Sequence, residues 1–404
     1  MKAAGIVCEC NPLHEGHQYL ISEAKKNGAD AVVCVMSGYF VQRGEPAVAD
    51  PYLRAEALLA GGADAVVELP FPYSSASAEF FSAAGVSVLS RLGADELWFG
   101  SECGDLSHLQ RLASIASSKE FEHRYAAAVG QSEGTATLYF DLLREFCGGG
   151  ISCDPNDILG LSYLRAIEEQ GATLIPRTVR RVGSGYGDAE VTEGKFPSAT
   201  ALRALLSNGG VDAAREYLLP ATAELLSAAF VRGAAPAEWK WAERLILGRL
   251  RTMTAEEIES AAELGGGLGA RLLQGARVAT GVEELFSIAA TKKYPTSRLR
   301  RGMLFALTGI GREVLSQPPA YTRLLAANDV GCRFLATRRR EDAIPVVTRR
   351  ADLPDTREAQ RQAEWERRAF GIWTLCLPKP MREDGLWKHP PRIRSDFEKM
   401  GNRH

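Results

Sequence analysis

The sequence has no long hydrophobic run and no pair of cysteines with the spacing of a metal site. No uninterrupted apolar run approaches the roughly 18 residues that a membrane-spanning helix needs, so we expect no membrane span and a cytoplasmic location. The eight cysteines include no C-x-x-C pair, which removes the usual ligand spacing of zinc sites and disulfide frameworks. We therefore expect no metal centre, and thiols that are reduced and partly buried.

A strong charge of one sign is also absent, because the 404 residues carry a formal net charge of only −2. The two ends of the chain nevertheless differ. Residues 291–404 contain 24 Lys and Arg against 13 Asp and Glu, a balance of +11, whereas residues 1–290 contain 24 against 37. Such an asymmetry indicates a polyanionic partner at the C-terminal end. Our candidates for contact with phosphates and an unstacked base surround Tyr294; they are Lys292, Lys293, Arg298, Arg300 and Arg301. Any one of them could equally belong to a solvated helix face.

Short apolar runs alternate with helical patterns over the first 210 residues. The expected strands are Ala3–Val7, Ala31–Met36, Ala65–Leu69, Glu96–Phe99 and Thr173–Ile175. The expected helices are Gly16–Lys26, Pro51–Ala60, Ser77–Leu92, a long stretch near 105–146, and Asp157–Glu169. Because strands at this spacing need crossover connections, we predict an α/β fold with a Rossmann-like, doubly wound parallel sheet.

The later part of the chain has a different character. From residue 211 the β-branched runs disappear, and Ala, Leu, Glu and Arg predominate between Pro and Gly breaks. We predict three units: an ATP-binding catalytic domain over 1–210, a helical domain over 211–327, and a small basic C-terminal region with a tail over 328–404. In the last unit, Phe334-Leu335 and Ile344–Val347 suggest a hairpin, and a helix is expected near Arg357–Trp373.

The segment Asn11-Pro-Leu-His-Glu-Gly-His17 follows the first expected strand directly and opens the first helix. This is the position at which an open α/β sheet holds phosphate, because the helix N-terminus offers unpaired N–H groups and a positive dipole end. Gly16 would let backbone approach a triphosphate. The two histidines could donate to oxygens that gain charge during attack at the α-phosphorus. A lone pair of loop histidines bonded to backbone is the alternative, and the strand-to-helix position favours the functional interpretation.

Other polar segments follow the other strands. Met36–Pro46 follows the second, Phe99-Gly-Ser-Glu102 the fourth, and Thr178–Val182 the fifth, while Asp154-Pro-Asn-Asp157 opens a helix. Since ligands bind outside the carboxyl ends of parallel strands, we expect these segments to converge on one crevice. Ser198 is placed to cap a further helix with Thr200 in its first turn, which gives a second N-terminus able to hold phosphate. Asn156 and Ser198 could each serve as a cap, a ligand contact, or both.

Two of these motifs, His14-Glu-Gly-His17 and Ser198-Ala-Thr-Ala-Leu-Arg203, resemble the signatures of the HxGH nucleotidyltransferase superfamily. Longer strings resemble the bacterial tRNA(Met) cytidine acetate ligase family from Met1 to about residue 350; they are NPLHEGH, VMSGYFVQRGEPA, VVELPFPYSSASAEFFSAAGV, FGSE, NDILGLSYL and TKKYPTSRLRR. The resemblance implies an ATP-dependent ligase that uses acetate to acetylate N4 of the wobble cytidine of elongator tRNA(Met). Acetyl-adenylate is the implied intermediate, and Mg²⁺ accompanies ATP.

The resemblance also assigns residues by position. It makes His14 and His17 catalytic. It implies ATP contacts at Val7, Cys8, Glu9, Cys10, Asn11, Pro12, Leu13, His14, Glu15, Gly16, His17, Gln18, Tyr19, Leu20, Gly100, Asn156, Arg180 and Arg181, to which we add Ser198 and Thr200 from the second motif. The chain departs from the family pattern at Cys10, Leu13, Glu15 and Gly187.

Two other functions remain open at the level of sequence. A small-molecule adenylyltransferase would share the HxGH sheet but would not need the basic C-terminal region, so retention of tRNA at moderate salt separates the two. A noncatalytic RNA-binding protein with a relic nucleotide fold would lack ATP–pyrophosphate exchange.

Overall fold

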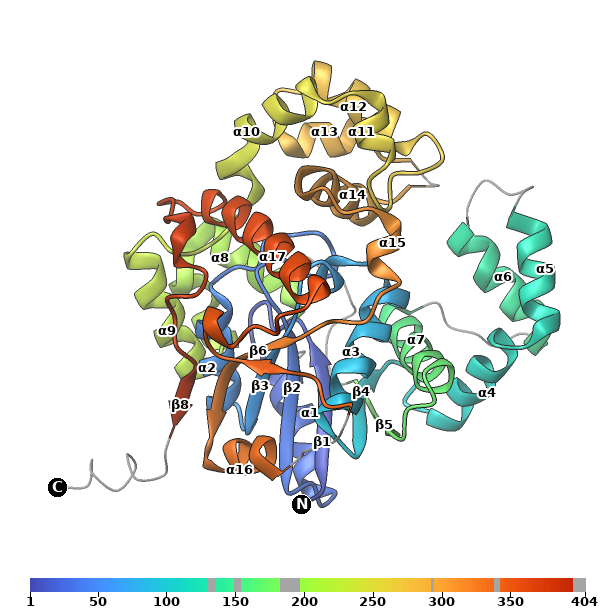
Figure 1. Cartoon of the computed structure of the whole chain (residues 1–404), viewed down its shortest axis with the longest axis vertical. Coiled ribbons are helices and arrows are strands. Elements are labelled where there is room, and N and C mark those ends of the chain that lie inside the picture. The colour runs from blue at the N-terminus through green and yellow to red at the C-terminus, as the bar shows by residue number, and fades with distance from the viewer. Residues whose placement is uncertain (130–134, 149–153, 182–196, 292–293, 338–341, 395–404) are drawn as a thin grey trace.

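Apolar, largely β-branched runs form the strands of a single sheet (Figure 1). The computed structural model describes residues 1–129, 135–148, 154–181, 197–291, 294–337 and 342–394. The strands are β1 (Ala3–Cys8), β2 (Ala31–Ser37), β3 (Ala65–Leu69), β4 (Glu96–Ser101), β5 (Ile175–Arg180), β6 (Thr322–Asn328), β7 (Val346–Val347) and β8 (Arg392–Arg394). Their order is β5-β4-β1-β2-β3-β6-β7, and β8 pairs with another part of β6. The first five strands are mutually parallel, whereas β6 is antiparallel to β3.

Helices connect the strands, and some of them cover the two faces of the sheet. They are α1 (Glu15–Lys26), α2 (Pro51–Ala60), α3 (Ala78–Leu92), α4 (Leu106–Ala116), α5 (Lys119–Val129), α6 (Thr135–Cys147), α7 (Pro155–Glu169), α8 (Ala199–Ala214), α9 (Pro220–Val231), α10 (Trp239–Thr252), α11 (Ala255–Glu259), α12 (Leu268–Val278), α13 (Val282–Ala289), α14 (Thr296–Thr308), α15 (Arg312–Leu315), α16 (Asp329–Thr337) and α17 (Arg357–Leu375).

Alternation of side chains along each strand divides the core into two layers. In β2, Val33 and Val35 pack with α3, α4, α7 and α16, whereas Val32 and Cys34 face α1 and α2 on the other side. The expected strand-to-helix crossovers place these helices, since successive parallel strands need connections that pass over a face of the sheet. The predicted α/β fold with a doubly wound parallel sheet is confirmed.

A separate helical layer lies beyond the carboxyl ends of the parallel strands (Figure 1). Helices α10 to α15 share one hydrophobic core with α17, and Tyr39, Phe40 and Phe71 extend into it from loops at the end of the sheet. Trp373 of α17 is buried there and its indole N–H donates to the carbonyl of Ala47 at 2.9 Å. This one core contains residues from before position 210 and from after position 327, so it crosses both predicted domain boundaries. The division into three units stays a proposal.

The fifth strand lies later in the chain than we predicted. We expected Thr173–Ile175, but β5 begins at Ile175 and continues through Thr178, which pairs with Phe99. The reason is that β5 is an edge strand whose side chains alternate between exposed and half-buried positions. Its polar second half therefore gave no apolar signal, and Thr178 lies within the strand rather than after it.

The prediction of a hairpin near the C-terminus was wrong. Phe334 and Leu335 belong to α16, where Phe334 is fully buried, and β7 instead pairs in parallel with β6. The helical region we expected up to residue 327 also ends in β6, whose sequence TRLLAAN is not rich in β-branched residues. This strand is specified by its pairing with β3 and by the burial of its side chains on both faces of the sheet. Neither of these can be read from the seven residues of the strand themselves. The long stretch near 105–146, which we predicted to be helical, forms the three helices α4 to α6.

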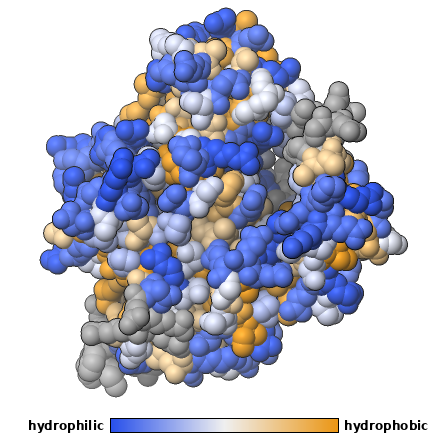
Figure 2. Space-filling model, turned by 45° about the vertical axis from the view of Figure 1, so that its right-hand side comes forward, coloured by the Kyte–Doolittle hydropathy of each residue, from blue (hydrophilic) through white to orange (hydrophobic). Residues whose placement is uncertain are grey.

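The face of the molecule in Figure 2 is mostly hydrophilic, with hydrophobic residues scattered between polar ones. Among the described helices, none combines the length and the apolar character that crossing a membrane requires.

Candidate nucleotide site

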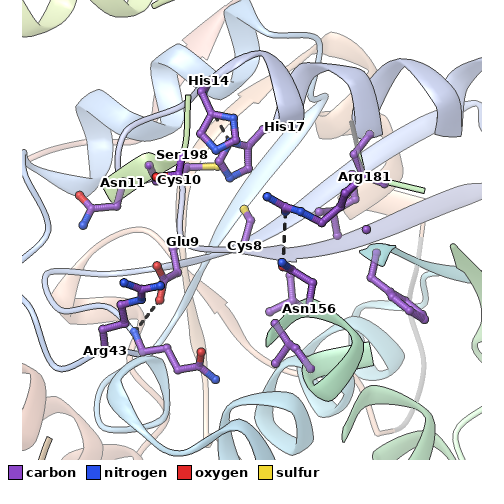
Figure 3. A pocket seen from close by; sticks show the side chains of 18 of the residues that line it. Cys8, Glu9, Cys10, Asn11, His14, His17, Arg43, Asn156, Arg181 and Ser198 are labelled. Carbon is purple, nitrogen blue, oxygen red and sulfur yellow. Dashed lines mark hydrogen bonds between the residues drawn. The ribbon is translucent and has the colours of Figure 1, made fainter. Parts of the chain in front are cut away.

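The two histidines of the HxGH motif lie side by side at the start of α1 (Figure 3). His14 is the N-cap, and its Nδ1 accepts the N–H of Gly16 at 3.1 Å. Nδ1 of His17 accepts the N–H of His14 at 3.4 Å, and the ring centroids are 4.0 Å apart. Because both Nδ1 atoms accept hydrogen bonds, each neutral ring carries its proton on Nε2. The motif therefore presents two Nε2–H donors from one helix N-terminus.

Both imidazoles are held in the neutral form. Burial lowers the pKa of His17 to about 4, and the positive charge of Arg181 adds to the effect. Burial, followed by the neighbouring His17 and Arg181, lowers the pKa of His14 well below its ordinary value. At neutral pH each ring can thus donate its Nε2–H to an anion while carrying no charge of its own.

The depressed histidine pKa predicts a pH-dependent stability. The unfolded chain binds a proton at His17 near pH 6.5, while the folded chain does so only near pH 4, so the unfolded state is favoured by acid between these values. We expect the free energy of unfolding to fall as the pH drops from about 6.5 to 4, by up to about 3 kcal/mol from this residue. Denaturant titrations at several pH values measure it. His17→Gln should flatten the curve, and parallel curves for the two proteins would contradict the assignment.

The opposite side of the cavity comes from α7 and the end of β5. The Nδ2 group of Asn156 donates to Glu102 at 2.5 Å, so its Oδ1 faces Arg181, which donates to it at 3.4 Å (Figure 3). A Cβ atom at Gly100 would lie 3.1 Å from Cγ of Arg181, so glycine leaves room for this side chain. The result is an amide oxygen and a guanidinium fixed across the cavity from the histidines.

The second motif supplies another helix N-terminus to the same cavity. Ser198 caps α8, its Oγ accepting the N–H of Ala201 at 3.1 Å, which confirms the predicted cap. Arg203 donates to the carbonyl of Asn11 at 3.0 Å and to Thr200 Oγ1 at 3.4 Å. Arg43 donates to the same hydroxyl at 3.3 Å. Two helix N-termini and three arginines, counting Arg181, therefore surround one space, an arrangement suited to a polyphosphate.

An acidic residue and a strained turn complete the cavity. Glu9 accepts the N–H of Gln42 at 2.8 Å. Burial raises the pKa of its carboxyl group, and the charges of Arg203 and Arg43 oppose that shift. Cys10 adopts a left-handed backbone conformation with φ of 47°, which residues other than glycine rarely adopt. Strain of this kind gathers at ligand sites.

Most of the predicted ATP residues line this one cavity, and some do not. Those that line it are Val7, Cys8, Glu9, Cys10, Asn11, His14, His17, Leu20, Gly100, Asn156, Arg181, Ser198 and Thr200. Those that lie off it are Pro12, Leu13, Glu15, Gly16, Gln18, Tyr19 and Arg180. Leu13 is buried in the core under α1, and Glu15 points to solvent. A Cβ atom at Gly16 would lie 2.9 Å from Cε1 of His14, so this glycine makes room for the imidazole. Gly187 lies outside the described residues.

Gln42, Arg43 and Arg203 also line the cavity and were not among the predicted contacts. Each stands in a string that we quoted, VQRG after the second strand or the Ser-x-Thr-x-x-Arg motif. The signal was therefore present, but only the fold shows which side chains of those strings turn inward.

The described members of the predicted basic cluster are already paired with carboxylates. Arg298 and Arg301 contact Glu263 at 3.8 and 3.1 Å, and Arg300 contacts Glu45 at 2.5 Å. Lys292 and Lys293 lie outside the described residues. Among the described residues, no group of three or more His, Cys, Asp or Glu side chains is arranged to hold a metal ion.

Comparison with known proteins places this geometry in a family. The family model described as HIGH nucleotidyl transferase matches residues 1–385. The tRNA(Met) cytidine acetate ligase of Anoxybacillus flavithermus is 33% identical over 404 residues, which cover 97% of this chain and 100% of that protein. The chain belongs to the tRNA(Met) cytidine acetate ligase family. Its relative of the same name from Acetivibrio thermocellus is 31% identical over 400 residues, covering 94% and 96% of the two chains.

Solved structures agree over almost the whole chain. The apo form I crystal structure of Thermotoga maritima TmcAL matches with a TM-score of 0.91 at 27% identity, covering 98% of this chain and 100% of that one. The form II structure of the same protein, bound with alpha-thio ATP, matches with a TM-score of 0.89 at 26% identity and the same coverage. The family resemblance and the fold predicted from the motifs are thus confirmed.

Proposed function

We propose that this protein is an ATP-dependent ligase that activates acetate as acetyl-adenylate and transfers the acetyl group to N4 of the wobble cytidine of elongator tRNA(Met). One observation carries the proposal. The HxGH helix N-terminus and the Ser-x-Thr helix N-terminus face a single cavity, in a chain that matches relatives of this name over nearly its full length.

The first half-reaction joins acetate to the α-phosphorus of ATP. A carboxylate oxygen of acetate attacks phosphorus, the bond to the bridging oxygen breaks, and pyrophosphate leaves. The protein's task is alignment and neutralisation of charge, which the Nε2–H groups of His14 and His17 and the guanidinium of Arg181 can supply. No acyl-enzyme is needed, so no Ser or Cys nucleophile is assigned.

The second half-reaction transfers the acetyl group. The N4 amine of cytosine attacks the acetyl carbonyl carbon, AMP leaves with the bonding electrons, and the amine loses a proton. A base paired in a helix cannot reach the cavity, whereas an anticodon-loop base can leave its stack. The adenylate must therefore stay bound until tRNA arrives.

In this proposal, Mg²⁺ binds together with ATP. Mg²⁺ favours oxygen ligands and keeps several waters, and in nucleotide sites it is held by one or two carboxylates together with phosphate oxygens. In the cavity the phosphates would supply most of the ligands, and the half-buried Glu9 is the carboxylate that the described lining residues would add. Its contribution would be to withdraw charge from the leaving pyrophosphate.

The basic C-terminal part would hold the tRNA. Reversing Arg298, Arg300 or Arg301 would also break their ion pairs inside the protein, so the test variant changes the other two proposed contacts, Lys292 and Lys293. We expect the Lys292→Glu/Lys293→Glu variant to flatten the salt dependence of tRNA binding by about one to two units of slope while ATP binding is kept. The matched control is Lys26→Glu/Lys119→Glu, with the same charge change on exposed residues of the N-terminal part. Equal slopes for both variants would contradict these contacts.

Acetate-dependent exchange of labelled pyrophosphate into ATP tests the proposed first step. The proposal predicts exchange with acetate and without tRNA, and retention of acetyl-AMP by the protein. Exchange that ignores acetate would favour a small-molecule adenylyltransferase, and no exchange with any acid would favour a noncatalytic RNA-binding protein.

A further inference from the structure

The loop between β2 and α2 connects the nucleotide cavity to the helical layer. Its residues Gln42 and Arg43 line the cavity. The next residue, Gly44, lies against α14, where a Cβ atom would come within 2.5 Å of the backbone nitrogen of Arg301. The carbonyl of Gly44 also accepts the indole N–H of Trp239 at 3.2 Å. The segment that presents Arg43 is therefore seated directly on α10 and α14.

The carboxylate of Glu45 makes the strongest link in this loop. Its Oε2 contacts Arg203 at 3.0 Å, and its Oε1 contacts Arg300 of α14 at 2.5 Å. All three side chains are less than 20% exposed. Shielding from water makes such charge pairs stronger and more fixed than surface pairs. One carboxylate thus joins the arginine of the second phosphate motif to the helical layer.

Arg203 is the residue through which Glu45 reaches the cavity. Its other hydrogen bonds go to the carbonyl of Asn11, within the HxGH loop, and to the hydroxyl of Thr200, and its charge also acts on the carboxyl group of Glu9. If Glu45 lost its charge, Arg203 would keep these weaker neighbours but lose the partner that fixes its guanidinium plane. A negative group beside the cavity also opposes the binding of ATP, so its presence is better explained by alignment than by affinity.

We propose that Glu45 is a positioning residue that aligns Arg203 for adenylate formation and couples that step to the seating of the helical layer on the loop. The inference rests on the proposed function for its reaction. It assigns to Glu45 no contact with substrate. It implies that a change at Arg300, outside the nucleotide cavity, alters chemistry inside it.

Replacing Glu45 with glutamine tests the inference with little change of shape. We expect kcat for acetate-dependent exchange to fall about tenfold, because alignment is lost, while KM for ATP does not rise, because a repelling charge is removed. The matched control is Glu283→Gln. Glu283 also contacts Arg300, at 3.4 Å, but is 73% exposed, and no contact joins it to Arg203 within the described residues. A merely structural role would raise KM, lower kcat and lower the unfolding midpoint together, and that result would overturn the inference.

A double-mutant cycle with Arg300→Met tests the coupling. If Arg300 acts through Glu45, the double variant should be no slower than Glu45→Gln alone. Losses that multiply, or an Arg300→Met variant with the wild-type kcat, would contradict the link. Arg300→Lys keeps the charge and should recover part of the rate.

Hydrogen exchange separates this inference from the proposed function. In Glu45→Gln and Arg300→Met, the backbone amide hydrogens of Val41 and Gly44 should exchange with solvent faster than in Glu283→Gln. The reason is that the loop is held less firmly against α10 and α14. A wild-type protein without acetate-dependent exchange would refute the proposed function alone. Equal exchange at these amides in all three variants would overturn the role of Glu45 whatever the reaction proves to be.

Discussion

Replacing His17 with alanine is expected to slow acetate-dependent ATP–pyrophosphate exchange by about 10²–10³, which is the usual cost of losing one donor to a developing charge. The fold should be retained, since His17 lines the cavity rather than the hydrophobic core, and its loss removes one bond to the backbone of His14 and the contact with the His14 ring. His14→Ala should slow the reaction similarly but also destabilise α1 by about 1 kcal/mol, because His14 is the helix cap.

His123→Ala is the control for this experiment, because His123 is exposed on α5 and lies outside the nucleotide cavity. It should leave the exchange rate unchanged. A His17→Ala variant that exchanges at the wild-type rate would remove the motif from the chemistry.

The two neighbouring arginines at the end of β5 should differ sharply in effect. Arg181 lines the cavity and contacts Asn156, whereas the side chain of Arg180 packs beside Gly104, away from the cavity. We expect Arg181→Met to lower kcat/KM for ATP by about 10², because a cation that would lie beside the phosphates in the cavity is lost.

The matched variant Arg180→Met removes the same charge from the next residue. It should change kcat/KM less than threefold, roughly the scale of an exposed charge seen through water and salt. Steady-state exchange kinetics over a range of ATP concentrations measure both. Equal losses for the two variants would mean that net charge, rather than the placement of Arg181, supports the reaction.

Local sequence patterns predicted those parts of the fold that local forces specify. The first four strands are apolar runs buried on both faces, and α2 was predicted with its exact bounds because Asp50 caps it and Pro51 occupies its first turn. By contrast, β6 is specified by its pairing with β3, more than 250 residues earlier in the chain. No local signal in TRLLAAN competes with the helical character of the residues before it.

The site divides in the same way. His14, His17 and Ser198 could be predicted because strand-to-helix turns and caps have short signatures in the chain. The net charge of +11 after residue 290 does not show which of these basic side chains form ion pairs within the protein. The carboxylates that pair with Arg300 and Arg301 are Glu45, Glu283 and Glu263, and Glu45 lies 255 residues away from Arg300. Only the fold shows that these arginines are held at an interface inside the molecule.

Mass measurement of nucleosides from elongator tRNA(Met), after incubation with this protein, ATP, Mg²⁺ and acetate, tests the central claim most directly. The account predicts N4-acetylcytidine at the wobble position, with deuterated acetate carried into the product, and no product from the His17→Ala protein or when ATP is omitted. Unmodified cytidine after incubation with a wild-type protein that binds ATP and tRNA would contradict it.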